Sequence, residues 1–170
     1  MISRRLLVCG LGGGAASIAL PAAAQKTWRT YRNERFGTSI DYPSDRFSPG
    51  APRASGDGLR FAAADGAAFT VSAINNVLHQ TLAAIENAVA KNLTGGERIA
   101  RREHGPNWFA ITGTRGNEIF YSRHLLSHRR EIINDFEITY PTKLRRLYDP
   151  IVLRMANSLR AGAGIDTGPP

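Results

Sequence analysis

Histidine is the residue type in this chain that could most readily bind a metal or move a proton, and two histidines lie four positions apart at His124 and His128. On a helix, that spacing would place both rings on one face and let them share a metal ion. The surrounding residues instead predict a strand end, where a backbone extended at ~3.3 Å per residue separates the pair by about 13 Å. We therefore predict no metal site and no cofactor.

A histidine acting as a general base would support a different chemistry, the hydrolysis of an ester or phosphate. His104 could approach His124 if their strands are neighbours, and Ser122 and Ser127 lie near His124 in the sequence. The chain has no Gly-x-Ser-x-Gly motif, and a catalytic triad is defined by geometry rather than by sequence. A solvated or hydrogen-bonded role is the simpler interpretation of each histidine. We assign no catalytic residue and keep a small hydrolase with a histidine base as an alternative.

Aromatic side chains could serve binding rather than catalysis. Most of them fall within the strands and helices that the sequence predicts, where core packing is their usual role. An aromatic cluster that faced solvent would instead be a candidate ligand surface. Our candidate is Trp108 and Tyr121 together with Arg123.

The first 24 residues have the composition of a signal peptide. A positive head that ends at Arg4 and Arg5 precedes an uncharged stretch, Leu6–Leu20, and a run of alanines that ends at Ala24. The adjacent arginines favour the twin-arginine export route over the general one. The only cysteine, Cys9, lies inside this segment, so cleavage after Ala24 would leave a chain without disulfides. We expect a periplasmic or secreted protein with no transmembrane segment after signal removal.

The charge balance is basic, with a formal net charge of +8 that falls by two when Arg4 and Arg5 leave with the signal peptide. The arginines are scattered in pairs, such as Arg129–Arg130, and acidic residues lie near each pair. Because the sequence has no long run of like charges, a nucleic-acid partner is not expected. Electrostatic binding to anionic polymers of the cell envelope stays open as another alternative.

Alternating apolar residues predict an antiparallel sheet, joined by turns at Asp65–Gly66, 105–107 and 115–117. The expected strands cover residues 36–42, 59–63, 69–74, 98–103, 108–112, 119–126 and 132–140. Residues 48–58 are rich in glycine, proline and serine and predict a loop.

Two helices complete the predicted domain, which covers residues 25–160. The first carries Leu78, Leu82, Ile85, Val89 and Leu93 on one face, with Asn76 or Thr81 as its N-cap and Gly95 as its stop. The second is expected to begin with Asp149 as N-cap and Pro150 as first residue. Residues 161–170 are expected to form a flexible tail.

The run from Tyr31 to Pro43, with Phe36–Gly37 and Tyr42–Pro43 near its ends, resembles the opening strand of Mog/PsbP-like domains. The segments around Asp57–Gly58, Trp108–Phe109 and Phe120–Tyr121 fit the same layout. The resemblance covers roughly residues 28–160. It implies an α+β fold in which helices flank an antiparallel sheet, an α/β/α sandwich.

The known members of that group are non-enzymatic: some assist the photosystem and others bind a small GTPase. Neither partner carries over, since no residues here match a binding motif. Taken together, the residues and the resemblance predict an exported, periplasmic, non-enzymatic binding or accessory protein. Its partner would be an unidentified protein or small molecule of the cell envelope.

Overall fold

The structure is a computed structural model that describes residues 27–93 and 96–163, so the predicted signal peptide, residues 1–24, lies outside the described residues. The strands are β1 (Trp28–Arg32), β2 (Ser39–Pro43), β3 (Phe47–Pro49), β4 (Gly58–Ala63), β5 (Ala68–Asn75), β6 (Glu97–His104), β7 (Trp108–Arg115), β8 (Glu118–Ser127) and β9 (Ile132–Pro141). The helices are α1 (Leu82–Asn92) and α2 (Arg145–Ser158), with short 3-10 turns at His128–Arg130 and Thr142–Leu144.

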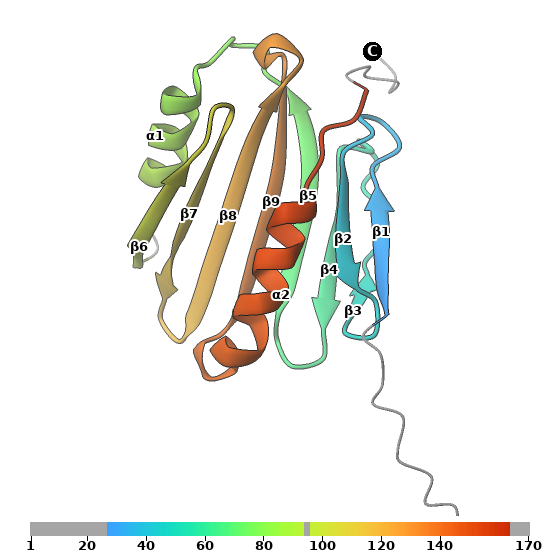
Figure 1. Cartoon of the computed structure of the whole chain (residues 1–170), viewed down its shortest axis with the longest axis vertical. Coiled ribbons are helices and arrows are strands. Elements are labelled where there is room, and N and C mark those ends of the chain that lie inside the picture. The colour runs from blue at the N-terminus through green and yellow to red at the C-terminus, as the bar shows by residue number, and fades with distance from the viewer. Residues whose placement is uncertain (1–26, 94–95, 164–170) are drawn as a thin grey trace, which may run out of the picture.

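Seven strands form one antiparallel sheet in the order β3-β4-β5-β9-β8-β7-β6, and β1 pairs with β2 as a separate hairpin. Strands β6 to β9 follow one another as a meander, as the sequence predicts, and β9 returns to pair with β5 (Figure 1). Helix α2 packs on one face of the sheet and α1 on the other. The predicted α+β architecture, an antiparallel sheet flanked by helices, is confirmed.

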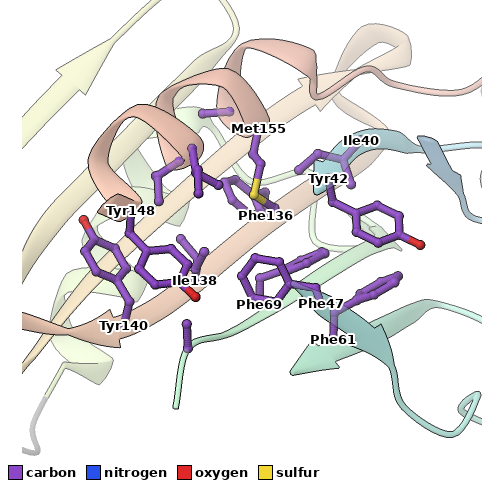
Figure 2. Packing of buried hydrophobic residues seen from close by; sticks show 14 of the residues in the cluster. Ile40, Tyr42, Phe47, Phe61, Phe69, Phe136, Ile138, Tyr140, Tyr148 and Met155 are labelled. Carbon is purple, nitrogen blue, oxygen red and sulfur yellow. The ribbon is translucent and has the colours of Figure 1, made fainter. Parts of the chain in front are cut away.

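The larger hydrophobic core lies between α2 and the centre of the sheet. Phe69 of β5 and Phe136 of β9 face Tyr148 and Met155 of α2 in this core (Figure 2). Phe61 and Phe69 stack with their ring centroids 4.4 Å apart. Because side chains alternate between the two faces of each strand, the residues of β9 between these apolar positions point to the opposite face.

Helix α1 covers part of that opposite face. Its buried Ile85 packs with Leu82, Val89 and Leu93 over Phe109, Ile111, Phe120, Leu126 and Ile133 of the sheet. The helix covers β7, β8 and the Ile133 end of β9, and no residue of β4 or β5 belongs to this cluster. Only the meander half of the sheet is therefore enclosed from this side.

The start of α1 distinguishes between the two predicted caps. The helix begins at Leu82 and Thr81 is its cap, while Asn76 is buried in the turn that precedes it. Leu78, which the sequence places on the apolar face, is 75 % exposed because the chain turns between Asn76 and Thr81. The prediction that Leu78 belongs to the helix was wrong. At its other end the helix stops at Asn92, and the predicted stop at Gly95 lies outside the described residues.

Helix α2 begins at Arg145, ahead of the predicted start. Pro150 lies inside it, in the second turn, where the missing N–H removes one hydrogen bond of the helix. Asp149 does not cap the helix. Its carboxylate accepts hydrogen bonds from the Tyr140 hydroxyl at 2.8 Å and from Arg145 Nε at 3.1 Å. The prediction for these two residues was wrong because Asp149 binds side chains of the sheet and helix instead.

The first predicted strand is shorter than expected. A turn occupies residues 34–36, Gly37 has φ +73°, and β2 starts at Ser39. Phe36, Ile40 and Tyr42 are nevertheless all buried, as their alternation predicts.

The end of the described chain packs against the start of the domain. Arg160 forms an antiparallel bridge with Ser39, and Gly162 lies against the backbone of Gly37 with no room for a Cβ atom. Residues 164–170 lie outside the described residues. Over residues 27–93 and 96–163, neither helix has the length and apolar character needed to cross a membrane.

Candidate functional site

The three residues of the predicted ligand surface lie together on one face of the sheet. In the register of β7 and β8, Trp108 is paired with Leu125, and Arg123 is paired with Ala110. Tyr121 follows two positions from Arg123 on β8, so side-chain alternation directs all three toward the α2 side. They form a cluster, which we call the Trp108 cluster.

Direct contacts order this cluster. The guanidinium carbon of Arg123 lies 4.0 Å from the centroid of the Trp108 ring, which is the geometry of a cation–π interaction. Arg123 also lies close enough to Tyr121 to act on the charge of its hydroxyl. Burial raises the pKa of Tyr121 above its ordinary value, although the charge of Arg123 opposes this shift. The Nε of Arg123 is buried with no hydrogen-bond partner among the described residues.

The cluster borders an open groove between α2 and the outer strands of the meander. In Figure 1, α2 crosses the middle of the sheet, and β6 and β7 carry no helix on the side that faces the viewer. The groove has a volume of about 310 Å³. Its walls include Tyr121 and Thr112 from the sheet and Val152 and Leu153 from α2. Leu153 is 63 % exposed and presents an apolar side chain at the rim.

Acidic side chains at this groove are already paired. Glu103 binds Arg101 at 2.6 Å, and Asp149 binds Arg145 at 3.1 Å. Within the described part of the chain, Arg123 makes no ion pair. The arginines that line the groove are therefore paired with its acids, and Arg123, next to the groove wall at Tyr121, is the cation with charge to offer to a ligand.

A second tryptophan stacks in the same way on the far side of α2. The guanidinium carbon of Arg154, on the exposed side of the helix, lies 3.8 Å from the ring centroid of Trp28 in β1. Leu153 and Arg154 also line a shallow hollow along this side of the helix. Leu153 thus lines both depressions, and an arginine-stacked tryptophan lies on each side of α2.

Gly105, which the sequence indicates only as part of a turn, sets the position of the Trp108 indole. A Cβ atom at this position would collide with the indole of Trp108, which lies directly on the glycine backbone. The Gly105 N–H also donates to the Trp108 carbonyl at 2.8 Å and closes the turn. The glycine positions Trp108 beneath Arg123. In the sequence, the feature that could have indicated this role is that Gly105 precedes Trp108 by one Pro-Asn turn.

The histidines do not form a common site. His124 is 4 % exposed, its Nδ1 lies 2.7 Å from Asp135 Oδ1, and its ring stacks on Phe109 at 4.6 Å. Its Nε2 is buried without a hydrogen-bond partner among the described residues. Although Ser122 lies two positions away on the same face, this nitrogen is out of reach of a solvent-borne substrate in this conformation.

The other two histidines of the sequence analysis lie apart from His124. His104 is separated from it by β7, and its Nε2 lies 2.9 Å from Glu86 of α1. Burial would raise the pKa of Glu86, but the hydrogen bonds and charges of His104 and Arg102 lower it overall. His128 contacts the carbonyl of Gly162. Over residues 27–93 and 96–163, no group of three His, Cys, Asp or Glu side chains could hold a metal ion.

Comparison with known proteins finds the fold but no relative by sequence. No family model and no curated protein matches the chain. The solution structure of cyanobacterial PsbP (CyanoP) from Synechocystis sp. PCC 6803 matches with a TM-score of 0.60 and 10% identity, over 85% of this chain and 98% of that chain. The Ran-binding protein Mog1p of Saccharomyces cerevisiae matches with a TM-score of 0.56 and 8% identity, over 80% and 96%. The chain therefore has the Mog/PsbP-like fold that the sequence predicts.

Proposed function

We propose that this protein is an exported, periplasmic, non-enzymatic binding or accessory domain that holds its partner on the groove beside the Trp108 cluster. The observation that carries the proposal is the arginine-stacked tryptophan beside the part of the sheet, at β6 and β7, that α2 leaves uncovered. The solved structures of similar fold include a Ran-binding protein, so this scaffold is compatible with protein binding.

The composition of the cluster fits a binding surface. Tryptophan, tyrosine and arginine are the residues that most often dominate the energy of protein interfaces. Here Arg123 already lies against the Trp108 ring and next to Tyr121 before any partner arrives. Such preorganisation lowers the entropy cost of ordering side chains on binding.

The charges of the surface indicate an acidic partner. Arg123 and Arg154 stack on tryptophans and make no ion pair among the described residues, whereas Glu103 and Asp149 are neutralised by neighbouring arginines. The exposed Leu153 between the two depressions offers an apolar contact. The partner expected here is a protein of the cell envelope that presents carboxylates around an apolar side chain.

Affinity capture from envelope extracts tests the proposal. The wild-type protein is expected to retain a partner that Arg123→Ala loses, since this change removes the guanidinium but leaves the fold intact. Arg60→Ala is the matched control, because Arg60 is exposed on β4 and points to the opposite face of the sheet. Equal retention by wild type and Arg123→Ala, or a loss seen equally with Arg60→Ala, would count against the proposal.

The His124–Asp135 hydrogen bond favours one second candidate, a small hydrolase with His124 as base, because an acid on Nδ1 is how such a base is oriented. This activity requires a motion that exposes Nε2. A broad panel of esterase and phosphatase substrates tests it: turnover that His124→Ala abolishes would support it, and no turnover would remove it. The third alternative, binding of anionic envelope polymers by charge alone, predicts salt-sensitive heparin retention that does not depend on Trp108.

A further inference from the structure

Two large apolar side chains protrude at one end of the sheet, away from the Trp108 cluster. Val77 is 76 % exposed and Leu78 is 75 % exposed, in the loop between β5 and α1. They are adjacent in sequence and neither lies in a core cluster. Two large apolar side chains exposed next to each other form a small apolar protrusion.

A buried asparagine fastens this loop to the turn between β8 and β9. Asn76 is 4 % exposed, and its side-chain amide donates to the carbonyls of Arg130 at 2.8 Å and Gln80 at 3.0 Å. Its Oδ1 accepts from the Gln80 N–H at 3.0 Å, and its own N–H donates to the Glu131 carbonyl at 2.7 Å. The two loops, residues 76–80 and 128–130, therefore form one rigid unit, which we call the apolar tip.

The backbone of this tip adopts conformations that side chains other than glycine rarely take. His79 has φ +47°, and three consecutive residues, His128, Arg129 and Arg130, have φ of +51°, +56° and +76°. Strain of this kind persists only where the surrounding structure enforces it. Here the hydrogen bonds of Asn76 enforce it and keep the loop that carries Val77 and Leu78 beside two arginines.

Basic and polar side chains accompany the apolar pair. A hollow of about 500 Å³ lies at this end of the molecule. It is lined by Thr81, Leu82, Ala83, Pro106, Asn107, Leu126, Ser127, His128, Arg129 and Arg130, with no carboxylate among them. Glu131 follows directly in the chain, so the tip retains a modest positive charge. The tip is therefore apolar where Val77 and Leu78 protrude and basic at the hollow beside them.

We propose that the apolar tip docks the protein on a membrane surface that contains anionic phospholipid. Val77 and Leu78 would enter the boundary between headgroups and acyl chains, while Arg129 and Arg130 contact lipid phosphates. A protein partner is less suited to this site, because a stable interface buries about 800 Å² on each side and two adjacent side chains cannot supply that area. A bilayer, in contrast, accepts a small protrusion.

The position of the tip is compatible with the binding surface described above. Figure 1 shows the β5–α1 loop and the β8–β9 turn together at one end of the strands, whereas α2 lies across the face of the sheet. A protein held at the membrane by its tip would keep the groove at Leu153 accessible. Membrane docking and partner binding are thus independent and can fail separately.

Flotation with lipid vesicles tests the inference. The purified protein is expected to float with vesicles of phosphatidylglycerol and phosphatidylethanolamine but not with vesicles of phosphatidylcholine. Val77→Ser combined with Leu78→Ser should weaken this binding by roughly tenfold or more, since both contributions of apolar burial are lost. Arg129→Ala with Arg130→Ala should also weaken it. Leu153→Ser is the matched control, because Leu153 is an exposed leucine outside the tip.

A tryptophan at the tip gives a signal that appears on membrane binding, so this second test does not rely on a loss of binding. In Leu78→Trp with Trp28→Phe and Trp108→Phe, the new indole should shift its emission to the blue with phosphatidylglycerol vesicles. The inference is overturned if the wild type does not float, if the double serine variant floats as well as wild type, or if the indole at position 78 stays in water. Loss of flotation in Leu153→Ser would also overturn it.

Discussion

The guanidinium carbon of Arg123 lies 4.0 Å from the centroid of the Trp108 ring, and the same side chain lies near Tyr121. This arrangement joins β7 to β8 at the edge of the groove. It leaves a cation without a carboxylate beside an aromatic surface. The binding proposal depends on this relationship, and the first two predictions test it.

Replacement of Arg123 by alanine should alter the environment of Trp108 while the fold survives. A cation–π pair contributes about 0.5–1 kcal/mol when exposed and about 2 kcal/mol when desolvated. Because Arg123 and Trp108 are half-buried, the free energy of unfolding should fall by no more than about 2 kcal/mol. The indole emission should shift because the cation leaves the ring. Fluorescence in a Trp28→Phe background isolates Trp108, and urea unfolding measures stability. Unchanged emission would show that Arg123 does not cover the ring in solution.

Gly105→Ala should displace the Trp108 ring while the Arg123 side chain itself is unchanged. The added Cβ would collide with the indole, so the ring must rotate away from its stacked position. We expect the emission of Trp108 to change as it does in Arg123→Ala, and partner capture to weaken. Gly116→Ala is the control, since a Cβ there meets no atom within 4 Å, although its φ of +55° carries its own strain. If Gly105→Ala captures the partner as well as wild type does, the position of Trp108 does not matter for binding.

Stability should fall in alkaline solution because of two stacked tyrosines, Tyr148 of α2 and Tyr140 of β9. Burial, followed by hydrogen bonds to carboxylates, raises the pKa of Tyr148 beside Asp65 and of Tyr140 beside Asp149. The unfolded chain releases these protons near pH 10 while the folded protein keeps them. The stabilisation is therefore complete below pH 10 and is lost as the pH rises above it. Urea titrations across this range should show a shallower decline for Tyr148→Phe with Tyr140→Phe, and an unchanged decline would contradict the assignment.

Asp135→Ala should destabilise the protein by about 1–3 kcal/mol, because it leaves His124 buried with neither ring nitrogen satisfied. Glu137→Ala is the matched control on the same strand and face, since Glu137 is exposed and paired only through the backbone. Its free energy of unfolding should stay within about 0.5 kcal/mol of wild type. If both variants unfold at the same urea concentration, His124 does not depend on Asp135.

The sequence was informative where apolar periodicity decides the structure. Alternation in β5, β8 and β9 and the spacing of Ile85 and Val89 predicted the sheet and both of its faces. The sequence was misleading at the start of each helix, because side-chain hydrogen bonds decide where the helix begins. Asn76 binds Arg130, far away in the chain, and Asp149 binds Tyr140, and neither partner can be read from local patterns.

The candidate surface was predictable in its members but not in its geometry. Trp108, Tyr121 and Arg123 could be grouped because adjacent antiparallel strands bring them together. The role of Gly105, the second stack of Arg154 on Trp28 and the apolar tip depend on contacts between distant segments. Such contacts follow from the register of the sheet and the placement of α2, which one sequence does not contain.

Site-specific photo-crosslinking tests the central claim most directly. A photoreactive residue at Thr112, inside the groove, should form a covalent adduct with a partner in the native envelope, and Arg123→Ala should abolish it. The same probe at Glu137, on the opposite face of the sheet, should form none. An adduct that forms from Glu137 and not from Thr112 would contradict the account.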